Sequence, residues 1–200
     1  MRSRFNGRRA FIWLCGAWVT VLTPTTLAMA SEALWEALQA GGKVVVVRHA
    51  PIERGPGQTD PRVRDPSCQT EAKLSARGRR DAAEFGRRFR AHQVAVSQVL
   101  HSPFCRTTET ATIAFEHATP SGFLALIEEM PPAQAAAQSR HLQQITSAHG
   151  GPGNLVLITH RPNIAAVSFE LLDYLDALVL APDGAGDYEE LGVIRFADSD

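Results

Sequence analysis

The sequence lacks several features that would place it in a well-marked class of protein. Its 20 lysines and arginines nearly balance its 21 aspartates and glutamates, so it has no excess of positive charge of the kind that nucleic-acid-binding proteins carry. It contains no internal repeat, no heptad pattern and no long low-complexity tract. With 44% hydrophobic residues in a chain of 200, it can bury one sizeable core, which predicts a single domain.

The sequence also has no long apolar run. The apolar run near the N-terminus, residues 10–22, is short. Residues 10–22 follow four arginines, at positions 2, 4, 8 and 9, and precede the small residues Ala28-Met29-Ala30. This order predicts a secretory signal peptide over residues 1–30, cleaved after Ala30, and a single domain over residues 31–200. The alternative, an uncleaved anchor, is disfavoured because the run ends short of a bilayer span of about 20 residues.

We therefore expect the protein to be exported, to a periplasm or to the medium, with no stable membrane span after cleavage. Arg8-Arg9 also resembles a twin-arginine signal, so the Sec and twin-arginine routes both stay open. Cleavage would remove four arginines and no acid, which leaves 16 basic and 21 acidic side chains. An anionic ligand must then be attracted by a local cluster of cations rather than by the field of the whole protein.

Cysteine is scarce, with three residues in the chain. Cys15 would leave with the signal peptide, and Cys68 and Cys105 would remain. Two cysteines in an exported protein predict one disulfide, which would be worth about 3–4 kcal/mol by the loop-entropy relation. The alternative is two unpaired cysteines packed as small hydrophobic residues.

Strand and helix patterns alternate along the chain. They predict an α/β fold, a three-layer sandwich with a mostly parallel central sheet flanked by helices. The expected strands are 44–47, 94–100, 123–127, 154–159, 177–180 and 191–196. The expected helices are 31–39, 74–91 with Ser75 as N-cap, 107–116, 131–149 and one after Pro162 whose apolar stripe is Ile164, Val167, Leu171 and Leu175.

Cationic and imidazole side chains follow three of these strands and precede a loop or helix. Arg48 and His49 end the first strand, Arg106 opens the helix after the second, and His160 follows 154–159. Because parallel strands end at the same edge of a sheet, we expect these side chains to meet in one crevice. Two guanidiniums and two imidazoles there predict a pocket for a phosphoryl group, since the planar fork of arginine can bond two phosphate oxygens at once.

A long Pro- and Gly-rich loop, residues 51–69, follows the first strand. Loops of this length inside a compact domain are usually functional or disordered. Arg54, Arg62 and Arg64 lie on it and could reach an anionic ligand, although such arginines are more often simply solvated. Of the three, Arg54 is the candidate for binding substrate.

These motifs together resemble the histidine phosphatase (phosphoglycerate-mutase-like) superfamily. The resemblance rests on Val-Val-Arg-His at residues 46–49, Leu-Ser-x-x-Gly-Arg at 74–79, Ser-Pro-Phe-Cys-Arg-Thr-Thr-Glu-Thr-Ala at 102–111 and Ile-Thr-His at 158–160. Each motif alone is weak, but four in this order at strand ends are specific. The match runs from residue 43 to about residue 170, and it is most similar to small exported bacterial members.

The resemblance implies a role for each matching residue. His49 would be the nucleophile and form a phosphohistidine, while Arg48, Arg106 and His160 would hold the phosphoryl oxygens. Ser102 would orient or hydrogen-bond the nucleophile side, and Arg161 is a further candidate for contacting substrate. No cofactor or metal is implied, because the sequence has no HExxH motif or Asp-rich loop and the arginines can stabilise the developing charge themselves.

The acid that would protonate the leaving group is less well marked. Some members use a Glu after the third strand, and Glu128 or Glu129 lies near that place, although the pair can equally be a solvated acidic loop. Another branch has Asp directly after the second histidine, where this chain has Arg161. A member without a strong acid would favour substrates with good leaving groups, such as phosphoramidates or acyl phosphates.

The leading interpretation is an exported, metal-independent phosphomonoesterase acting on a small phosphorylated substrate, for example a phosphorylated cell-envelope sugar. One alternative is a non-catalytic module of the same fold that binds phosphate. The other is a phosphoprotein phosphatase, including one for phosphohistidine, which an open pocket would favour. The sequence predicts no nucleic-acid partner and is silent on the oligomeric state.

Overall fold

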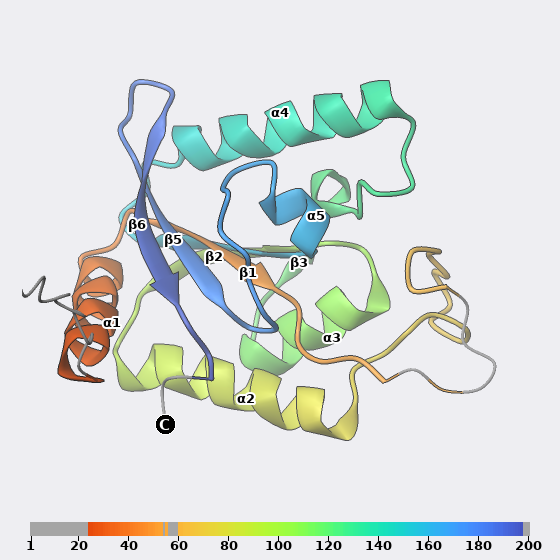
Figure 1. Ribbon diagram of the computed structural model, residues 1–200, viewed down its shortest axis with the longest axis horizontal. Helices are drawn as coiled ribbons and strands as arrows, with labels where there is room; N and C mark the ends of the chain where they lie inside the picture. The colour runs from red at the N-terminus through yellow and green to blue at the C-terminus, as the bar shows by residue number, and fades with distance from the viewer. Residues whose placement is uncertain (1–23, 54, 56–59, 198–200) are drawn as a thin grey trace, which may run out of the picture.

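The computed structural model describes residues 24–53, 55 and 60–197. Its centre is one six-stranded sheet, which Figure 1 shows between the helices. The strand order is β3-β2-β4-β1-β5-β6. The strands are β1 Val44–Arg48, β2 Val96–His101, β3 Thr119–Pro120, β4 Asn154–Thr159, β5 Ala177–Pro182 and β6 Tyr188–Ile194. The pairs β1–β4, β4–β2 and β2–β3 are parallel, whereas β5 runs antiparallel to both of its neighbours. The prediction of a mostly parallel central sheet is confirmed.

Helices cover both faces of this sheet and make the fold three-layered. They are α1 Pro24–Gln39, α2 Ala76–Ala91, α3 Cys105–Ala114, the 3₁₀ turn η1 Gly122–Leu124, α4 Pro132–Ala148 and α5 Arg161–Ile164. In Figure 1, α2 and α3 lie below the sheet, α4 and α5 lie above it, and α1 lies beside β6. Within the described ranges, no helix is both long and apolar enough to cross a membrane.

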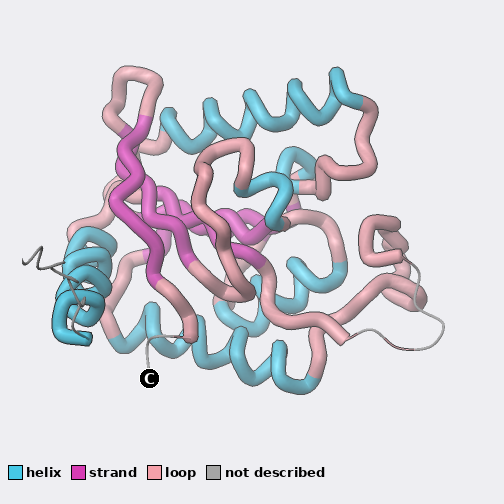
Figure 2. Tube along the Cα trace, in the orientation of Figure 1, coloured by secondary structure: helices cyan, strands magenta, loops and turns pink. Residues whose placement is uncertain are grey.

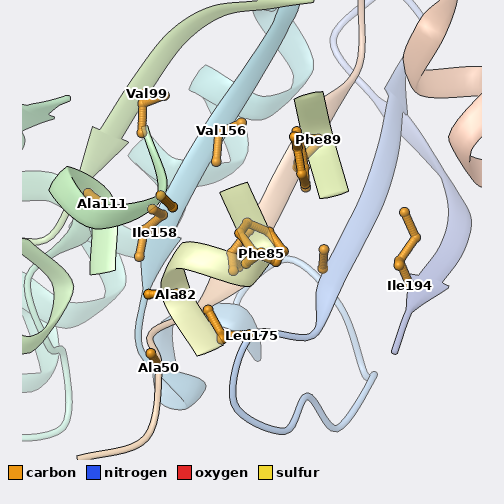
Figure 3. Close-up of a cluster of buried hydrophobic side chains, with 14 of the residues drawn as sticks. Ala50, Ala82, Phe85, Phe89, Val99, Ala111, Val156, Ile158, Leu175 and Ile194 are labelled. Atoms are coloured by element: carbon orange, nitrogen blue, oxygen red, sulfur yellow. The ribbon is translucent and has the colours of Figure 1, made fainter. Parts of the chain in front are cut away.

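The core is built by the alternation of side chains along the buried strands. In β1, Val45 and Val47 pack on the side of α2, and Val44 and Val46 pack on the side of α4. Figure 3 shows the first of these two cores, in which Phe85 projects from α2 toward the sheet. Burial on both faces explains why β1 is a run of four valines rather than an alternating segment.

The start of α2 is fixed against the end of β1. The side chain of Ser75 caps the helix by accepting a hydrogen bond from the N–H of Gly78, as predicted. A side chain at Gly78 would overlap the carbonyl oxygen of Pro51, so only glycine allows this close approach. These two contacts explain the Leu-Ser-x-x-Gly spacing and hold the segment that follows His49. Between Pro51 and Ser75, Figure 2 shows a long loop that leaves the sheet.

The expectation of a strand over 123–127 is wrong. The third strand is only Thr119–Pro120, and the chain then turns into η1. The segment around Leu124 does not join the sheet. The carbonyl oxygen of Leu124 accepts hydrogen bonds from the side chains of Thr159 (2.9 Å) and Asn163 (3.4 Å). Side chains therefore satisfy a backbone group that would otherwise need a neighbouring strand.

The expectation of a long helix after Pro162 is also wrong, because α5 ends at Ile164. Its supposed apolar stripe does not share one face. Ile164 and Val167 belong to the core on the α4 side, Leu175 belongs to the core on the α2 side, and Leu171 is exposed. The chain must cross the end of the sheet between these residues, which a straight helix cannot do.

The first helix begins earlier than expected, at Pro24 rather than at residue 31. Residues 1–23 of the expected signal peptide lie outside the described residues, so cleavage after Ala30 and a domain over 31–200 stay predictions.

Candidate active site

The carboxyl ends of β1 and β4 and the first turn of α3 meet at one small cavity of about 170 Å³. Six of the residues predicted from the sequence to form the site line it: Arg48, His49, Arg106, Glu128, His160 and Arg161. Arg62, from the loop after β1, lines it as well. The crevice expected at the end of the parallel strands is therefore present, and its lining includes two histidines and four arginines.

His49 is almost fully buried, and the backbone of the next residue, Ala50, fixes the orientation of its ring. Nδ1 lies 2.8 Å from the carbonyl oxygen of Ala50, which can only accept, so Nδ1 carries the proton. The N–H of Ala50 is itself held by the hydroxyl of Thr110 at 3.0 Å. The other ring nitrogen, Nε2, then keeps its lone pair, and this lone pair accepts a hydrogen bond from Nε of Arg106 at 3.2 Å.

Arg106 lies in the first turn of α3 and contacts both histidines. Its Nη2 donates to Nδ1 of His160 at 3.1 Å, so one guanidinium bridges the two imidazoles. Its Nη1 is buried and has no hydrogen-bond partner within the described part of the chain. One cation therefore lies between the two histidines, and its Nη1 group forms no hydrogen bond with the described residues.

His160 is held from behind by Ser102. Because Nδ1 of His160 accepts from Arg106, the neutral ring carries its proton on Nε2 and donates it to Oγ of Ser102 at 2.7 Å. Ser102 is fully buried. The expectation that Ser102 would contact the side of His49 is therefore wrong: it is bonded to the second histidine instead.

Both imidazoles are kept neutral by their surroundings. Burial, reinforced by the charges of Arg106 and Arg48, lowers the pKa of His49 from 6.5 to about 3. Burial also holds the pKa of His160 well below its usual value, with further lowering by His49 and the same two arginines. Burial lowers the pKa of Arg106 to about 10, which leaves it charged at neutral pH. The cavity thus combines neutral nitrogen lone pairs with fixed positive charge.

Arg48 is anchored by the segment that precedes β5. Its Nη1 donates to the carbonyl oxygen of Leu172 at 3.0 Å and lies 3.8 Å from a carboxylate oxygen of Asp173. Its guanidinium carbon lies 4.0 Å from the centre of the Tyr174 ring, which also approaches the ring of His49. Tyr174 lines the cavity, and no strand end or motif in the sequence marks it.

The remaining predicted residues are placed differently. Arg54 lies outside the described residues. Glu128 lines the cavity, whereas the carboxylate of Glu129 pairs with Arg62 at 3.0 Å. Arg64 donates to the carbonyl oxygen of Pro103 at 3.3 Å and does not line the cavity. Of the two acidic candidates, Glu128 is therefore the better placed to meet a ligand.

A disulfide joins Cys68 to Cys105, as predicted, with 5.8 Å between the two Cα atoms. It ties the loop after β1 to the residue directly before Arg106. Glu71, on the same loop, is a buried carboxylate that accepts a 2.6 Å hydrogen bond from the N–H of Cys105. Nothing in the sequence marks Glu71, because an acidic residue in a polar loop is normally solvated. Across the described ranges, no group of three or more His, Cys, Asp or Glu side chains is arranged to hold a metal ion.

Comparison with solved structures shows the same fold. The protein histidine phosphatase SixA in complex with tungstate aligns with a TM-score of 0.59 at 15% identity, over 79% of this chain and 99% of that one. A mutant of phosphoserine phosphatase from Entamoeba histolytica, in complex with phosphoserine, gives 0.56 at 11% identity, with the same coverages of 79% and 99%. A mycobacterial glucosyl-3-phosphoglycerate phosphatase bound to inorganic phosphate gives 0.52 at 17% identity, over 74% and 94%.

Sequence comparison adds an independent finding. No curated protein matches the sequence. The family model for the histidine phosphatase superfamily (branch 1) matches residues 44–132, which include β1, β2 and α3 and therefore Arg48, His49 and Arg106. Over residues 44–132 the chain is therefore similar to the histidine phosphatase superfamily, and its fold and its arrangement of histidines and arginines agree with that similarity.

Proposed function

We propose that this protein hydrolyses phosphomonoesters through a phosphohistidine formed on His49. The similarity to the histidine phosphatase superfamily over residues 44–132 supports this proposal. The observation that carries the proposal is the geometry of His49: Nδ1 is protonated against the carbonyl oxygen of Ala50, and the Nε2 lone pair faces the guanidinium of Arg106. A neutral imidazole with its lone pair directed at fixed positive charge is suited to attack a phosphoryl group.

The reaction follows from this arrangement in two displacements. Nε2 of His49 attacks phosphorus, and the bond from phosphorus to the leaving oxygen breaks with its electron pair on that oxygen. The hydrogen bond from Arg106 to Nε2 must be exchanged for bonds to the phosphoryl oxygens, which frees the lone pair. Water then attacks the phosphohistidine, breaks the P–N bond and releases inorganic phosphate.

Positive charge stabilises both displacements. Negative charge spreads over the phosphoryl oxygens in the transition state, and Arg48 and Arg106 line the cavity where these oxygens would lie. Nη1 of Arg106 has no hydrogen-bond partner among the described residues and lies on the side of Glu71, so the donors that would turn to the phosphoryl oxygens are Nε and Nη2, which contact the two histidines. Glu128 is the carboxyl group in the cavity lining that can give a proton to the leaving oxygen.

The small volume of the cavity favours a second candidate, hydrolysis of phosphohistidine or another phosphate carried on a protein. About 170 Å³ holds a phosphoryl group and little more, whereas pockets that enclose a whole small ligand measure roughly 300–1,000 Å³. The rest of the substrate must then lie outside the cavity. A phosphoramidate also has a better leaving group than an alkyl ester. SixA, which has the same fold, is described as a protein histidine phosphatase.

The expected signal peptide limits which substrates the enzyme can meet. If residues 1–30 direct export and are removed, residues 31–200 form the working domain outside the cytoplasm. Phosphorylated sugars of the cell envelope and other small exported phosphate esters are then the substrate class we propose. N-terminal sequencing of protein recovered from the source cell's periplasm or medium tests this part: Ser31 as first residue supports it, and retention of Met1 in the cytoplasm overturns it.

Hydrolysis of p-nitrophenyl phosphate, with and without EDTA, tests the activity. We expect EDTA-insensitive turnover by the wild type, none by a His49→Ala variant, and an acid-labile phosphoenzyme trapped only in the wild type. A wild type that binds phosphate but never turns over would overturn catalysis and establish the phosphate-binding module instead. Comparing kcat/KM for phosphoserine and for a phosphohistidine-bearing protein then decides between the two candidate substrate classes.

A further inference from the structure

We propose that Glu71 is a positioning residue that fixes the guanidinium of Arg106 from behind and tunes how strongly the cavity holds phosphate. This inference rests on the proposed function, because it concerns the same phosphoryl pocket. It goes beyond that function in assigning a task to a buried acid that does not line the cavity.

The first observation is the environment of Glu71. Glu71 is only 1% exposed. A carboxylate is rarely buried this completely unless other groups pair with it. One oxygen accepts the N–H of Cys105 at 2.6 Å, and the other accepts the N–H of Asp65 at 3.1 Å. The oxygen bonded to Cys105 also lies 3.7 Å from Nη1 of Arg106. The carboxylate therefore has fixed contacts with two backbone groups and faces one cation.

The second observation is that Arg106 has no negative counter-charge among the described residues other than Glu71. Its other two nitrogens face His49 and His160, which are neutral and supply lone pairs but no negative charge. Among the described residues, Glu71 forms the one ion pair of Arg106, and both side chains are buried. Burying a guanidinium without a counter-charge costs folding free energy. Glu71 lowers this cost and so keeps Arg106 charged and oriented before phosphate binds.

The third observation is that the segment bearing Glu71 is itself fixed at α3. The carboxylate of Asp65 accepts hydrogen bonds from the backbone N–H groups of Ser67, Gln69 and Thr70 and folds this segment into a compact turn. The disulfide from Cys68 then ties the turn to Cys105. Glu71 and the disulfide thus hold the first two residues of α3 from the same segment, so the position of Arg106 is set from outside its own helix.

The chemical consequence has two parts. Burial raises the pKa of Glu71, whereas its two backbone N–H contacts and the charge of Arg106 favour the ionised carboxylate. The negative charge of this carboxylate weakens the attraction of Arg106 for phosphate in the ground state, because it partly neutralises the guanidinium. The same contact fixes the plane of the guanidinium, so its donors meet the transition state without a search for orientation. Removing the charge while keeping the shape should therefore tighten the binding of phosphate and slow the reaction, a pair of effects that simple loss of folding cannot produce.

The test is Glu71→Gln in the full chain with the disulfide intact. We expect inorganic phosphate, titrated calorimetrically, to bind roughly 3- to 10-fold more tightly, and kcat on p-nitrophenyl phosphate to fall about 10- to 100-fold. Glu109→Gln is the matched control, because Glu109 likewise accepts a backbone N–H, from Leu74, and lies 3.8 Å from an arginine, Arg79. We expect the control to leave phosphate affinity and kcat near the wild-type values.

Two further variants keep the proposal falsifiable if the Glu71→Gln protein folds poorly. Glu71→Asp retains the charge and should restore wild-type phosphate affinity. In an Arg106→Lys background, the effect of Glu71→Gln on phosphate affinity should be largely lost, because Glu71 acts through the guanidinium. An unchanged phosphate affinity in Glu71→Gln, or an equal effect in both backgrounds, would overturn the proposal. The affinity measurements do not need turnover, so they decide it even if the proposed phosphatase activity fails.

Discussion

Oγ of Ser102 lies 2.7 Å from Nε2 of His160, and both side chains are buried. This bond fixes which nitrogen of His160 carries the proton and leaves Nδ1 facing Arg106. The second histidine is therefore oriented by a residue that directly follows β2 and does not itself line the cavity. Outer partners of this kind are what keep a reactive ring in one tautomer and one rotamer.

Replacing Ser102 by alanine should therefore reduce activity more than stability. We expect kcat/KM on p-nitrophenyl phosphate to fall about 10- to 100-fold, because His160 can rotate and change tautomer. The lost hydrogen bond should cost about 1 kcal/mol of unfolding free energy. Steady-state kinetics and urea unfolding measure the two effects. Ser139→Ala, which removes a hydroxyl bonded within α4, is the control, and equal kinetic losses in both variants would contradict the assignment.

Stability should depend on pH through the two buried histidines. Their folded-state pKa values lie below the usual 6.5, at about 3 for His49, so the unfolded chain takes up protons that the folded protein refuses. This contribution is fully present above about pH 6.5 and is lost as the pH falls toward about 3, by up to about 1.4 kcal/mol per pH unit for each group. Urea unfolding at pH 7 and pH 5, without phosphate, measures this loss of stability. In a His49→Gln variant, the unfolding free energy should depend less steeply on pH. An unchanged slope in the variant would show that His49 is not the group responsible.

The disulfide should stabilise the loop and, through it, the arginine. Cys68 and Cys105 are 37 residues apart, so replacing both by serine should lower the free energy of unfolding by about 3–4 kcal/mol. Activity should fall further than the folded fraction does, because the segment that carries Glu71 loses one of its ties to α3. Thiol titration of denatured protein checks the premise: the full chain should show one free thiol, from Cys15, and three would contradict it.

The sequence could predict the elements that deliver the reactive groups because each group lies close after the carboxyl end of a strand, directly after β1 and β4 and in the first turn of α3 after β2. His49, Arg106 and His160 are found this way, and the shared sheet edge brings them together. Tyr174 and Glu71 could not be found, because irregular segments carry them to the cavity and to Arg106, and irregular segments have no period. The two wrong elements have the same cause. Leu124 and Leu175 have the pattern of regular structure, but each is buried by a turn of the chain.

The proposed role of Glu128 as the acid can be tested by comparing substrates with different leaving groups. If it is the acid, Glu128→Gln should lower kcat on an alkyl phosphate such as phosphoserine about 100-fold, while p-nitrophenyl phosphate, whose leaving group needs no proton, should change less than about threefold. Glu129→Gln is the matched control, because the carboxylate of Glu129 pairs with Arg62 rather than lining the cavity. Equal small effects on both substrates in both variants would mean that the leaving group departs unassisted. The enzyme would then be confined to phosphoramidates, acyl phosphates and similar substrates, and the weight would move to hydrolysis of phosphohistidine.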